Sequence, residues 1–131
     1  MTTYLVDTDW LIDAIVGVPA ARVLLNRLSG DGVAVSMVSL GELFEGVHLS
    51  PDPAEHLRSL KGFLTGYTIL NLSEAIMEEF GRIRADLRRH GMLIPDLDLL
   101  IAATALHHNL SLVTRNVRHF IRIPGLNLFQ P

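Results

Sequence analysis

The 131-residue chain contains no cysteine. Disulfide bonds and thiolate metal sites are therefore excluded, and any metal ion must be held by oxygen or imidazole ligands. The histidines are poor candidates for zinc, because the six of them never form a zinc-binding spacing such as H-E-x-x-H. We expect the adjacent His107 and His108, near the end of a helix, to bind backbone carbonyls or to face solvent.

Long hydrophobic runs and a strong excess of charge are also missing. No apolar segment approaches the roughly 18 residues that a membrane-spanning helix needs. The first residues, Met1 to Tyr4, lack a basic region followed by an apolar stretch. We therefore expect a soluble, cytoplasmic protein with no membrane partner. The net charge is −3, so contact with a nucleic acid would depend on local basic patches.

The chain does contain enough apolar sequence, 49% of its residues, for one hydrophobic core. No repeat, low-complexity segment or linker divides it, so residues 1–131 are predicted to form a single domain. Strand-like and helix-like runs alternate, which predicts an α/β fold with a mainly parallel sheet covered on both faces. Strands are predicted at 3–6, 33–36, 67–70 and 110–114, with a possible edge strand at 126–129. Helices are predicted at 9–16, 19–28, 39–48, 53–64, 73–91, 97–108 and 117–120.

Three acidic side chains and one amide stand at the borders of these predicted elements. They are Asp7, closing the first strand; Glu42 and Asp98, opening two helices; and Asn116, after the fourth strand. In an open parallel sheet, functional groups gather at the carboxyl ends of strands and at the adjoining helix starts. Carboxylates that meet there repel one another, and a divalent cation removes that cost while activating a water for attack on phosphorus. Oxygen ligands favour Mg²⁺ or Mn²⁺, so the pattern predicts a metal-dependent nuclease site.

Each of these residues also has a simpler explanation, which is that it caps a helix. Ser39 and Glu42 match the Ser-x-x-Glu capping box. Residue types that commonly cap helices also stand at the other three positions, Asp7, Asp98 and Asn116. For one residue alone, the cap is the more frequent explanation. Ser or Thr caps a helix equally well, however, so three acids and an amide at four starts favour a site over four independent caps.

Other polar residues near these borders have less certain roles. Asp96 fits an outer metal ligand and a turn residue after Pro95 equally well. The arginines of the helix predicted at 73–91 are more readily explained as a solvated face than as RNA contacts. A second basic cluster lies beside the proposed site and is the better candidate for phosphate binding: Arg115, Arg118, His119 and Arg122.

Four segments of the chain carry a family resemblance. They are Leu5-Val6-Asp7-Thr8-Asp9, Ser39-x-x-Glu42-Leu43-x-x-Gly46, the run from Asp98 to Ala105, and the run from Leu112 to Leu126. Together, and in this order, they resemble the PIN-domain family, in particular the VapC-type toxins of bacterial type II toxin–antitoxin pairs. The resemblance spans nearly the whole chain.

The resemblance implies a three-layer α/β/α sandwich and a metal-dependent endoribonuclease that hydrolyses RNA phosphodiester bonds. It also implies a homodimer and a cognate VapB-like antitoxin that covers the site and often inserts a basic side chain among the acids. The Mg²⁺ or Mn²⁺ ligands of the family match Asp7, Glu42 and Asp98. Positions that complete the site match Asp96 and Asn116, and polar positions that orient ligands or water match Thr8, Asp9 and Thr114.

Two alternative functions fit part of the pattern. The run Asp7-Thr8-Asp9 after an apolar strand could supply the aspartyl nucleophile of a phosphatase of the haloacid dehalogenase type. That family has Thr or Val where Leu11 stands, and it gives no role to Glu42 or Asp98. The second alternative is a non-catalytic PIN-like module that only binds RNA or a partner, and the retention of three acids argues against it.

Overall fold

A computed structural model describes residues 2–131 and has a parallel four-stranded sheet at its centre. The strands are β1 (Tyr4–Val6), β2 (Val33–Ser36), β3 (Thr68–Leu70) and β4 (Ser111–Val113). Their order across the sheet is β3-β2-β1-β4, and every neighbouring pair is parallel. The chain places β2 and β3 on one side of β1 and returns to place β4 on the other. A topological switch point therefore lies between β1 and β4.

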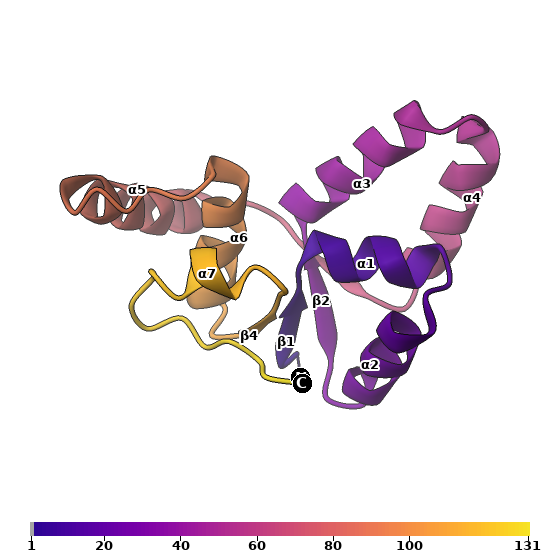
Figure 1. Cartoon of the computed structure of the whole chain (residues 1–131), viewed down its shortest axis with the longest axis horizontal. Helices are drawn as coiled ribbons and strands as arrows, with labels where there is room; N and C mark the ends of the chain where they lie inside the picture. Colours follow the sequence, from indigo (N-terminus) through magenta and orange to yellow (C-terminus); the bar gives the residue numbers. More distant parts are fainter. Residues whose placement is uncertain (1) are drawn as a thin grey trace.

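Helices make the crossovers that parallel strands require. Those of the described residues are α1 (Thr8–Ile15), α2 (Pro19–Ser29), α3 (Met37–Leu49), α4 (Pro53–Leu64), α5 (Glu74–Arg89), α6 (Asp96–His107) and α7 (Val117–Phe120). Helices α5, α6 and α7 lie on one side of the sheet, and α1 and α2 lie on the other (Figure 1). Helix α3 leads away from the sheet, and α4 returns to pack on the same side as α1 and α2. The predicted three-layer α/β/α architecture is confirmed. Within residues 2–131, each helix is too short or too polar to cross a bilayer.

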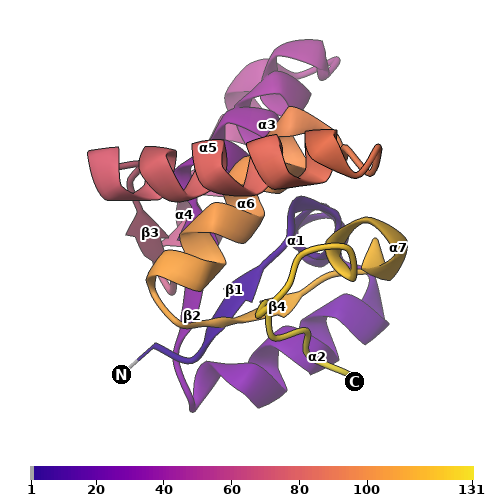
Figure 2. The same cartoon turned by 90° about the vertical axis from the view of Figure 1, so that its left-hand side faces the viewer.

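Alternating side chains of the strands divide the hydrophobic core in two, because successive residues of a strand point to opposite faces. In β1, Leu5 packs in the cluster formed with α5 and α6, whereas Val6 packs in the cluster formed with α1 and α2. Both side chains are fully buried. Helix α6 was expected to be buried on most sides, and Leu99 and all residues from Ile101 to Ala105 are buried. It lies between the sheet and α5, which runs across it (Figure 2).

The starts of α1, α3, α5 and α6 differ by one or two residues from the prediction, and those of α3 and α6 matter for the site. Helix α3 begins two residues early, at Met37, because the hydroxyl of Ser36 accepts a hydrogen bond from the backbone N–H of Val38 and caps the helix. The capping box proposed for Ser39 and Glu42 is therefore wrong, and Glu42 lies in the second turn of α3. Helix α6 begins at Asp96, so Asp98 lies in its first turn rather than at its start.

The predicted edge strand at 126–129 is reduced to a single bridge. Leu128 pairs in parallel with Leu112 of β4, and no longer ladder follows within the described residues. The Phe129 backbone N–H donates to the Leu112 carbonyl at 2.9 Å, and Leu112 N–H donates to Asn127. The C-terminal segment thus covers the outer edge of β4 without extending the sheet.

Candidate active site

The ends of β1 and β4 meet at the switch point of the sheet. Val6 and Val113, the last residues of these strands, are paired in register. The backbone N–H of Asp7 donates to the Val113 carbonyl at 2.9 Å. Asp7 and Thr114, the first residues beyond the two strands, therefore face one another at the position where open α/β sheets bind their ligands.

Asp7 is only 4% exposed, and its carboxylate accepts hydrogen bonds from two donors. One oxygen, Oδ1, accepts from the Thr8 backbone N–H at 2.8 Å, which caps α1. The other oxygen, Oδ2, accepts from the Thr114 hydroxyl at 2.7 Å. Each oxygen retains a lone pair for a further partner. The cap proposed for this residue is thus present, and it leaves room for a second role.

Burial raises the pKa of Asp7 above its ordinary value of 3.8, and the nearby charges of Asp98 and Asp9 raise it further. The hydrogen bonds from Thr114 and Thr8 lower the pKa without cancelling the effect of burial. None of the ion pairs within residues 2–131 involves Asp7 or Glu42. The folded chain therefore holds a buried negative charge that no basic side chain neutralises.

Replacing Asp7 by Asn is expected to stabilise the metal-free protein at pH 7. The raised pKa means that ionised Asp7 is more costly in the folded state than in the unfolded chain. This cost is absent below pH 3.8, where both states are protonated, and it grows as the pH rises through the folded-state pKa. Asn caps a helix about as well as Asp. Thermal melts in EDTA should therefore show a higher melting temperature for Asp7→Asn than for wild type at pH 7, by a few degrees for each roughly 1 kcal/mol of cost that is removed.

The pH dependence of that gain provides the control. The difference in melting temperature between Asp7→Asn and wild type should shrink steadily as the pH is lowered toward 3.8. A gain that is constant with pH, or a wild-type protein that is the more stable of the two at pH 7, would contradict the charge explanation.

Glu42 is held by a short chain of hydroxyl groups. The Thr8 Oγ1 atom lies 2.7 Å from Glu42 Oε1 and 2.8 Å from Ser39 Oγ. A hydroxyl has one proton and an ionised carboxylate can only accept, so Thr8 donates to Glu42 and Ser39 donates to Thr8. Ser39 lies one turn before Glu42 on the same face of α3. Ser39 matched a capping box in the sequence, and its i, i+3 spacing from Glu42 was the signal for this shared face.

Asp98 accepts a hydrogen bond from His119, which was predicted only as a member of the basic cluster near the site. His119 Nδ1 lies 2.9 Å from Asp98 Oδ2, and the Asp98 side chain is 18% exposed. Because the ionised carboxylate can only accept, Nδ1 carries the proton. No periodicity signals this contact, since the two residues belong to different helices, α6 and α7.

Asp96 and Asn116 contribute differently from the central acids. The exposed Asp96 carboxylate accepts from Arg84 Nε at 2.8 Å, which links α6 to α5. Asn116 precedes α7 without a side-chain cap, and its backbone N–H donates to the Thr114 hydroxyl at 3.0 Å. Asn116 therefore supports the loop that carries Thr114, while Asp96 lies at the outer edge of the acidic group.

Of the three arginines proposed to bind phosphate, two have intramolecular partners. Arg115 pairs with Asp13 at 2.7 Å, and its guanidinium carbon lies 3.9 Å from the centre of the Trp10 ring. Arg122 Nη1 donates to backbone carbonyls of the loop before α6. Arg118 is exposed and makes no ion pair within residues 2–131. Of the three, Arg118 is therefore the one whose guanidinium has neither an ion pair nor a hydrogen bond within the described residues.

The acidic group fits a divalent cation in its chemistry. Its donors are carboxylate oxygens, which hard cations such as Mg²⁺ prefer, and its most buried member lacks a counter-charge. In the described part of the chain, no three acidic or histidine side chains are gathered as closely as bound metal ligands. Glu42 is bonded to Thr8 and Asp98 to His119. The carboxylates therefore form a loose group, and a cation between them would relieve their repulsion.

Comparisons with known proteins identify the family and the fold. The family model described as PIN domain matches residues 4–126. The chain is 32% identical to the tRNA(fMet)-specific endonuclease VapC of Shigella flexneri, with 96% of each chain covered. Among solved structures, VapBC2 from Rickettsia felis, bound to a DNA fragment from its promoter, is similar with a TM-score of 0.91, 32% identity and 98% coverage of both chains. A toxin-antitoxin complex from Klebsiella pneumoniae is similar with a TM-score of 0.77, 28% identity and 95% coverage of both chains.

The chain therefore belongs to the PIN-domain family. The resemblance to VapC-type proteins drawn from the four sequence segments is confirmed.

Proposed function

We propose that this chain is a metal-dependent endoribonuclease and the toxin component of a type II toxin–antitoxin pair. The observation that carries the proposal is a buried carboxylate without a counter-charge, Asp7, at the switch point of a PIN-domain sheet. Glu42 and Asp98 come from the neighbouring helices α3 and α6. The VapC relative, which acts on a tRNA, supports RNA as the substrate class.

We assign the metal to three carboxylates, Asp7, Glu42 and Asp98, with Mg²⁺ or Mn²⁺ as the ion. When bound, the cation supplies Lewis acidity at the phosphodiester and a water of lowered pKa. Thr8 and Thr114 hold carboxylate oxygens in place by donating to Glu42 and Asp7. Asp9 adds negative charge near Asp7. Asp96 is proposed as an outer ligand and Asn116 as a residue that supports the loop or orients water.

The experiment that tests the activity offers the purified protein two substrates in Mg²⁺. Internal cleavage of a mixed RNA is expected, and hydrolysis of p-nitrophenyl phosphate is not. Release of phosphate together with a trapped aspartyl-phosphate would instead support the haloacid dehalogenase alternative. Binding of RNA without any cleavage would support a non-catalytic module.

Arg118 is the proposed contact to the RNA phosphates, because it is exposed, precedes His119 in the chain and has no acidic partner in the described residues. Arg118→Ala is expected to raise the Kd for RNA about three- to tenfold and to lower the slope of log Kd against log salt concentration by about one. Fluorescence anisotropy over a range of salt concentrations measures both. The control is Lys61→Ala, which removes an exposed positive charge from α4 and should leave binding unchanged.

Arg115→Ala provides a second comparison. It should lower the melting temperature more than it lowers RNA affinity, because Arg115 stacks on Trp10 and pairs with Asp13. If Arg115→Ala weakens RNA binding and Arg118→Ala does not, the assignment of the phosphate contact to Arg118 is wrong.

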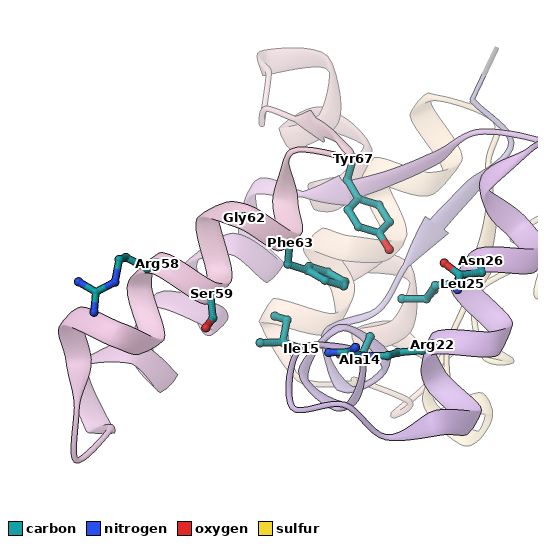
Figure 3. A pocket seen from close by; sticks show the side chains of 10 residues that line it. All are labelled: Ala14, Ile15, Arg22, Leu25, Asn26, Arg58, Ser59, Gly62, Phe63 and Tyr67. Atoms are coloured by element: carbon teal, nitrogen blue, oxygen red, sulfur yellow. The ribbon is translucent and has the colours of Figure 1, made fainter.

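The antitoxin is proposed to bind along two partly apolar hollows that share Ile15, the smaller of which reaches the site at Glu42. A hollow of about 480 Å³ lies between α1, α2 and α4, and Ile15, Leu25 and Phe63 are among its apolar walls (Figure 3). A smaller hollow on the other side of Ile15 is lined by Leu43 and reaches Glu42. An apolar segment lying along these hollows would end at the acidic group. An Arg placed there would satisfy the carboxylates with charge-assisted hydrogen bonds.

Replacing that basic antitoxin residue by Ala is expected to weaken inhibition while most of the affinity remains, because the apolar anchors carry it. Electron paramagnetic resonance of Mn²⁺ should detect binding by the free toxin and its loss in the complex. Mn²⁺ binding that is equally tight in the complex would show that the antitoxin blocks RNA elsewhere.

A homodimer is proposed through the face between α3, α6 and the loop before α5. Leu97 and Leu72 are 49% and 38% exposed and, with Met37 and Leu100, line a hollow of about 380 Å³ next to Glu42. Contiguous exposed apolar side chains of this kind mark contact surfaces. Sedimentation velocity of the free protein measures the oligomeric state.

A further inference from the structure

The segment from Thr114 to Arg122 contacts two of the site's carboxylates. Thr114 donates to Asp7 Oδ2 at 2.7 Å, and His119 Nδ1 donates to Asp98 Oδ2 at 2.9 Å. The two acids belong to different elements, the end of β1 and the first turn of α6. One short segment thus fixes the orientation of carboxylates that lie far apart in sequence.

This segment is itself fixed at three positions. At its start, Arg115 stacks on Trp10 and pairs with Asp13 of α1. In its middle, the fully buried Phe120 packs in the core with α6. At its end, Arg122 donates to the Leu93 carbonyl at 3.1 Å, just before α6. Because the segment is fixed at these positions, a side chain that it carries can hold a carboxylate in one orientation. Metal ligands are commonly oriented by such hydrogen-bonding neighbours.

The bond from His119 also determines which Asp98 oxygen remains available. Oδ2 is taken by Nδ1, and within residues 2–131 no donor is bonded to Oδ1. Without His119, the carboxylate of this partly exposed side chain would be free to rotate about its terminal torsion, which is broad for Asp. Rotation of the Asp98 carboxylate would leave Oδ1 without a fixed position in a site whose acids are not already close together.

We propose that His119 is a positioning residue of the site, whose Nδ1–H holds Asp98 in the orientation that leaves Oδ1 for the cation. The proposal rests on the metal-dependent function proposed above and adds a residue to it. Partners that hydrogen-bond metal ligands are worth about ten- to a hundredfold in metal affinity. His119 would act through Asp98 and would not touch the RNA itself.

The test compares substitutions that keep or remove the donor at the position of Nδ1. His119→Phe keeps a planar ring without a donor, and His119→Asn places an amide N–H near the position of Nδ1. Titration with Mn²⁺ alone, followed by paramagnetic resonance or calorimetry, should show about tenfold weaker binding for Phe. Binding by Asn should stay within about threefold of wild type. If His119→Phe does not fold, His119→Gln replaces it as the variant that lacks a donor at the position of Nδ1, because the Gln amide lies nearer the position of Nε2.

The matched control is another histidine beside an aspartate outside the site. His90 Nδ1 lies 3.7 Å from Asp86 Oδ1 on α5, and His90→Phe should leave Mn²⁺ affinity unchanged. RNA cleavage adds a second measurement. The loss of activity in His119→Phe should be largely recovered at saturating Mn²⁺, because the variant's defect lies in metal affinity.

Two outcomes would overturn the proposal, and they are distinguishable. Wild-type Mn²⁺ affinity in His119→Phe, with wild-type protein that binds and cleaves, would remove the positioning role and leave the proposed function intact. A wild-type protein that neither binds Mn²⁺ nor cleaves RNA would contradict both.

Discussion

Asp98→Asn is expected to reduce RNA cleavage by at least about a hundredfold while leaving the fold intact. The amide has nearly the same shape as the carboxylate, so it creates no cavity and still accepts the hydrogen bond from His119. It removes one ligand charge, and weaker perturbations of metal surroundings already cost about ten- to a hundredfold. The substitution removes a negative charge that stabilises the first turn of α6, and it also removes the repulsion between Asp98 and Asp7. These two effects on the free energy of unfolding oppose one another. The melting temperature should therefore change by no more than about 3 °C, the effect of under 1 kcal/mol.

The chain offers a matched control for Asp98→Asn. Glu74 is an exposed acid in the first turn of α5, so Glu74→Gln removes a charge from an equivalent helix position away from the site. This variant should cleave RNA at the wild-type rate. Full activity of Asp98→Asn at the same metal concentration would remove Asp98 from the catalytic group.

Withdrawal of divalent metal is the second change with a large expected effect. Protein dialysed against EDTA should not cleave RNA, and Mg²⁺ or Mn²⁺ should restore cleavage. Ca²⁺ is expected to bind and yet support little turnover, because its looser and more variable coordination positions reacting groups less well. Cleavage time courses after each addition measure the difference. Undiminished cleavage in EDTA after extensive dialysis would refute a metal-dependent mechanism.

Binding of the metal should also be visible without RNA. An ion that binds only the folded protein stabilises it by mass action, by about 2.7 kcal/mol at a hundred times its Kd. The wild-type melting temperature should therefore rise with added Mn²⁺, and Asp98→Asn should gain much less. An equal rise in both proteins would show that the ion binds elsewhere.

The fold class and most element borders could be predicted from the sequence because they depend on local patterns. The apolar runs of β1 and β2 and the turn signals between elements are short-range features, and the structure follows them within one or two residues. Gly17, where the first helix was expected to stop, adopts a φ of +91° that favours glycine. The start of α3 was misplaced because Ser36 and Ser39 both suit a cap, and local sequence does not decide between them.

The acids of the proposed site were singled out in the chain because acids near strand ends and helix starts lie at predictable edges of a parallel sheet, although Glu42 proved to lie one turn into α3. The sequence could not show how each carboxylate is held. The bond from His119 to Asp98 and the relay from Ser39 through Thr8 to Glu42 join residues on different elements. Such contacts depend on how α1, α3, α6 and α7 pack, which no spacing along the chain encodes.

The sequence by itself determined the α/β class and the buried α6, because hydrophobic period and residue type act locally. It also supplied Asp7, Glu42 and Asp98 as candidates for the proposed site, which remain a prediction. Only the tertiary structure decided which basic side chains remain available. Arg115, Arg118 and Arg122 look equivalent in sequence. In the structure, however, Arg115 pairs with Asp13, and Arg122 donates to two backbone carbonyls. The burial that raises the pKa of Asp7 is likewise a tertiary property, since it arises when helices from distant parts of the chain exclude water from the end of β1.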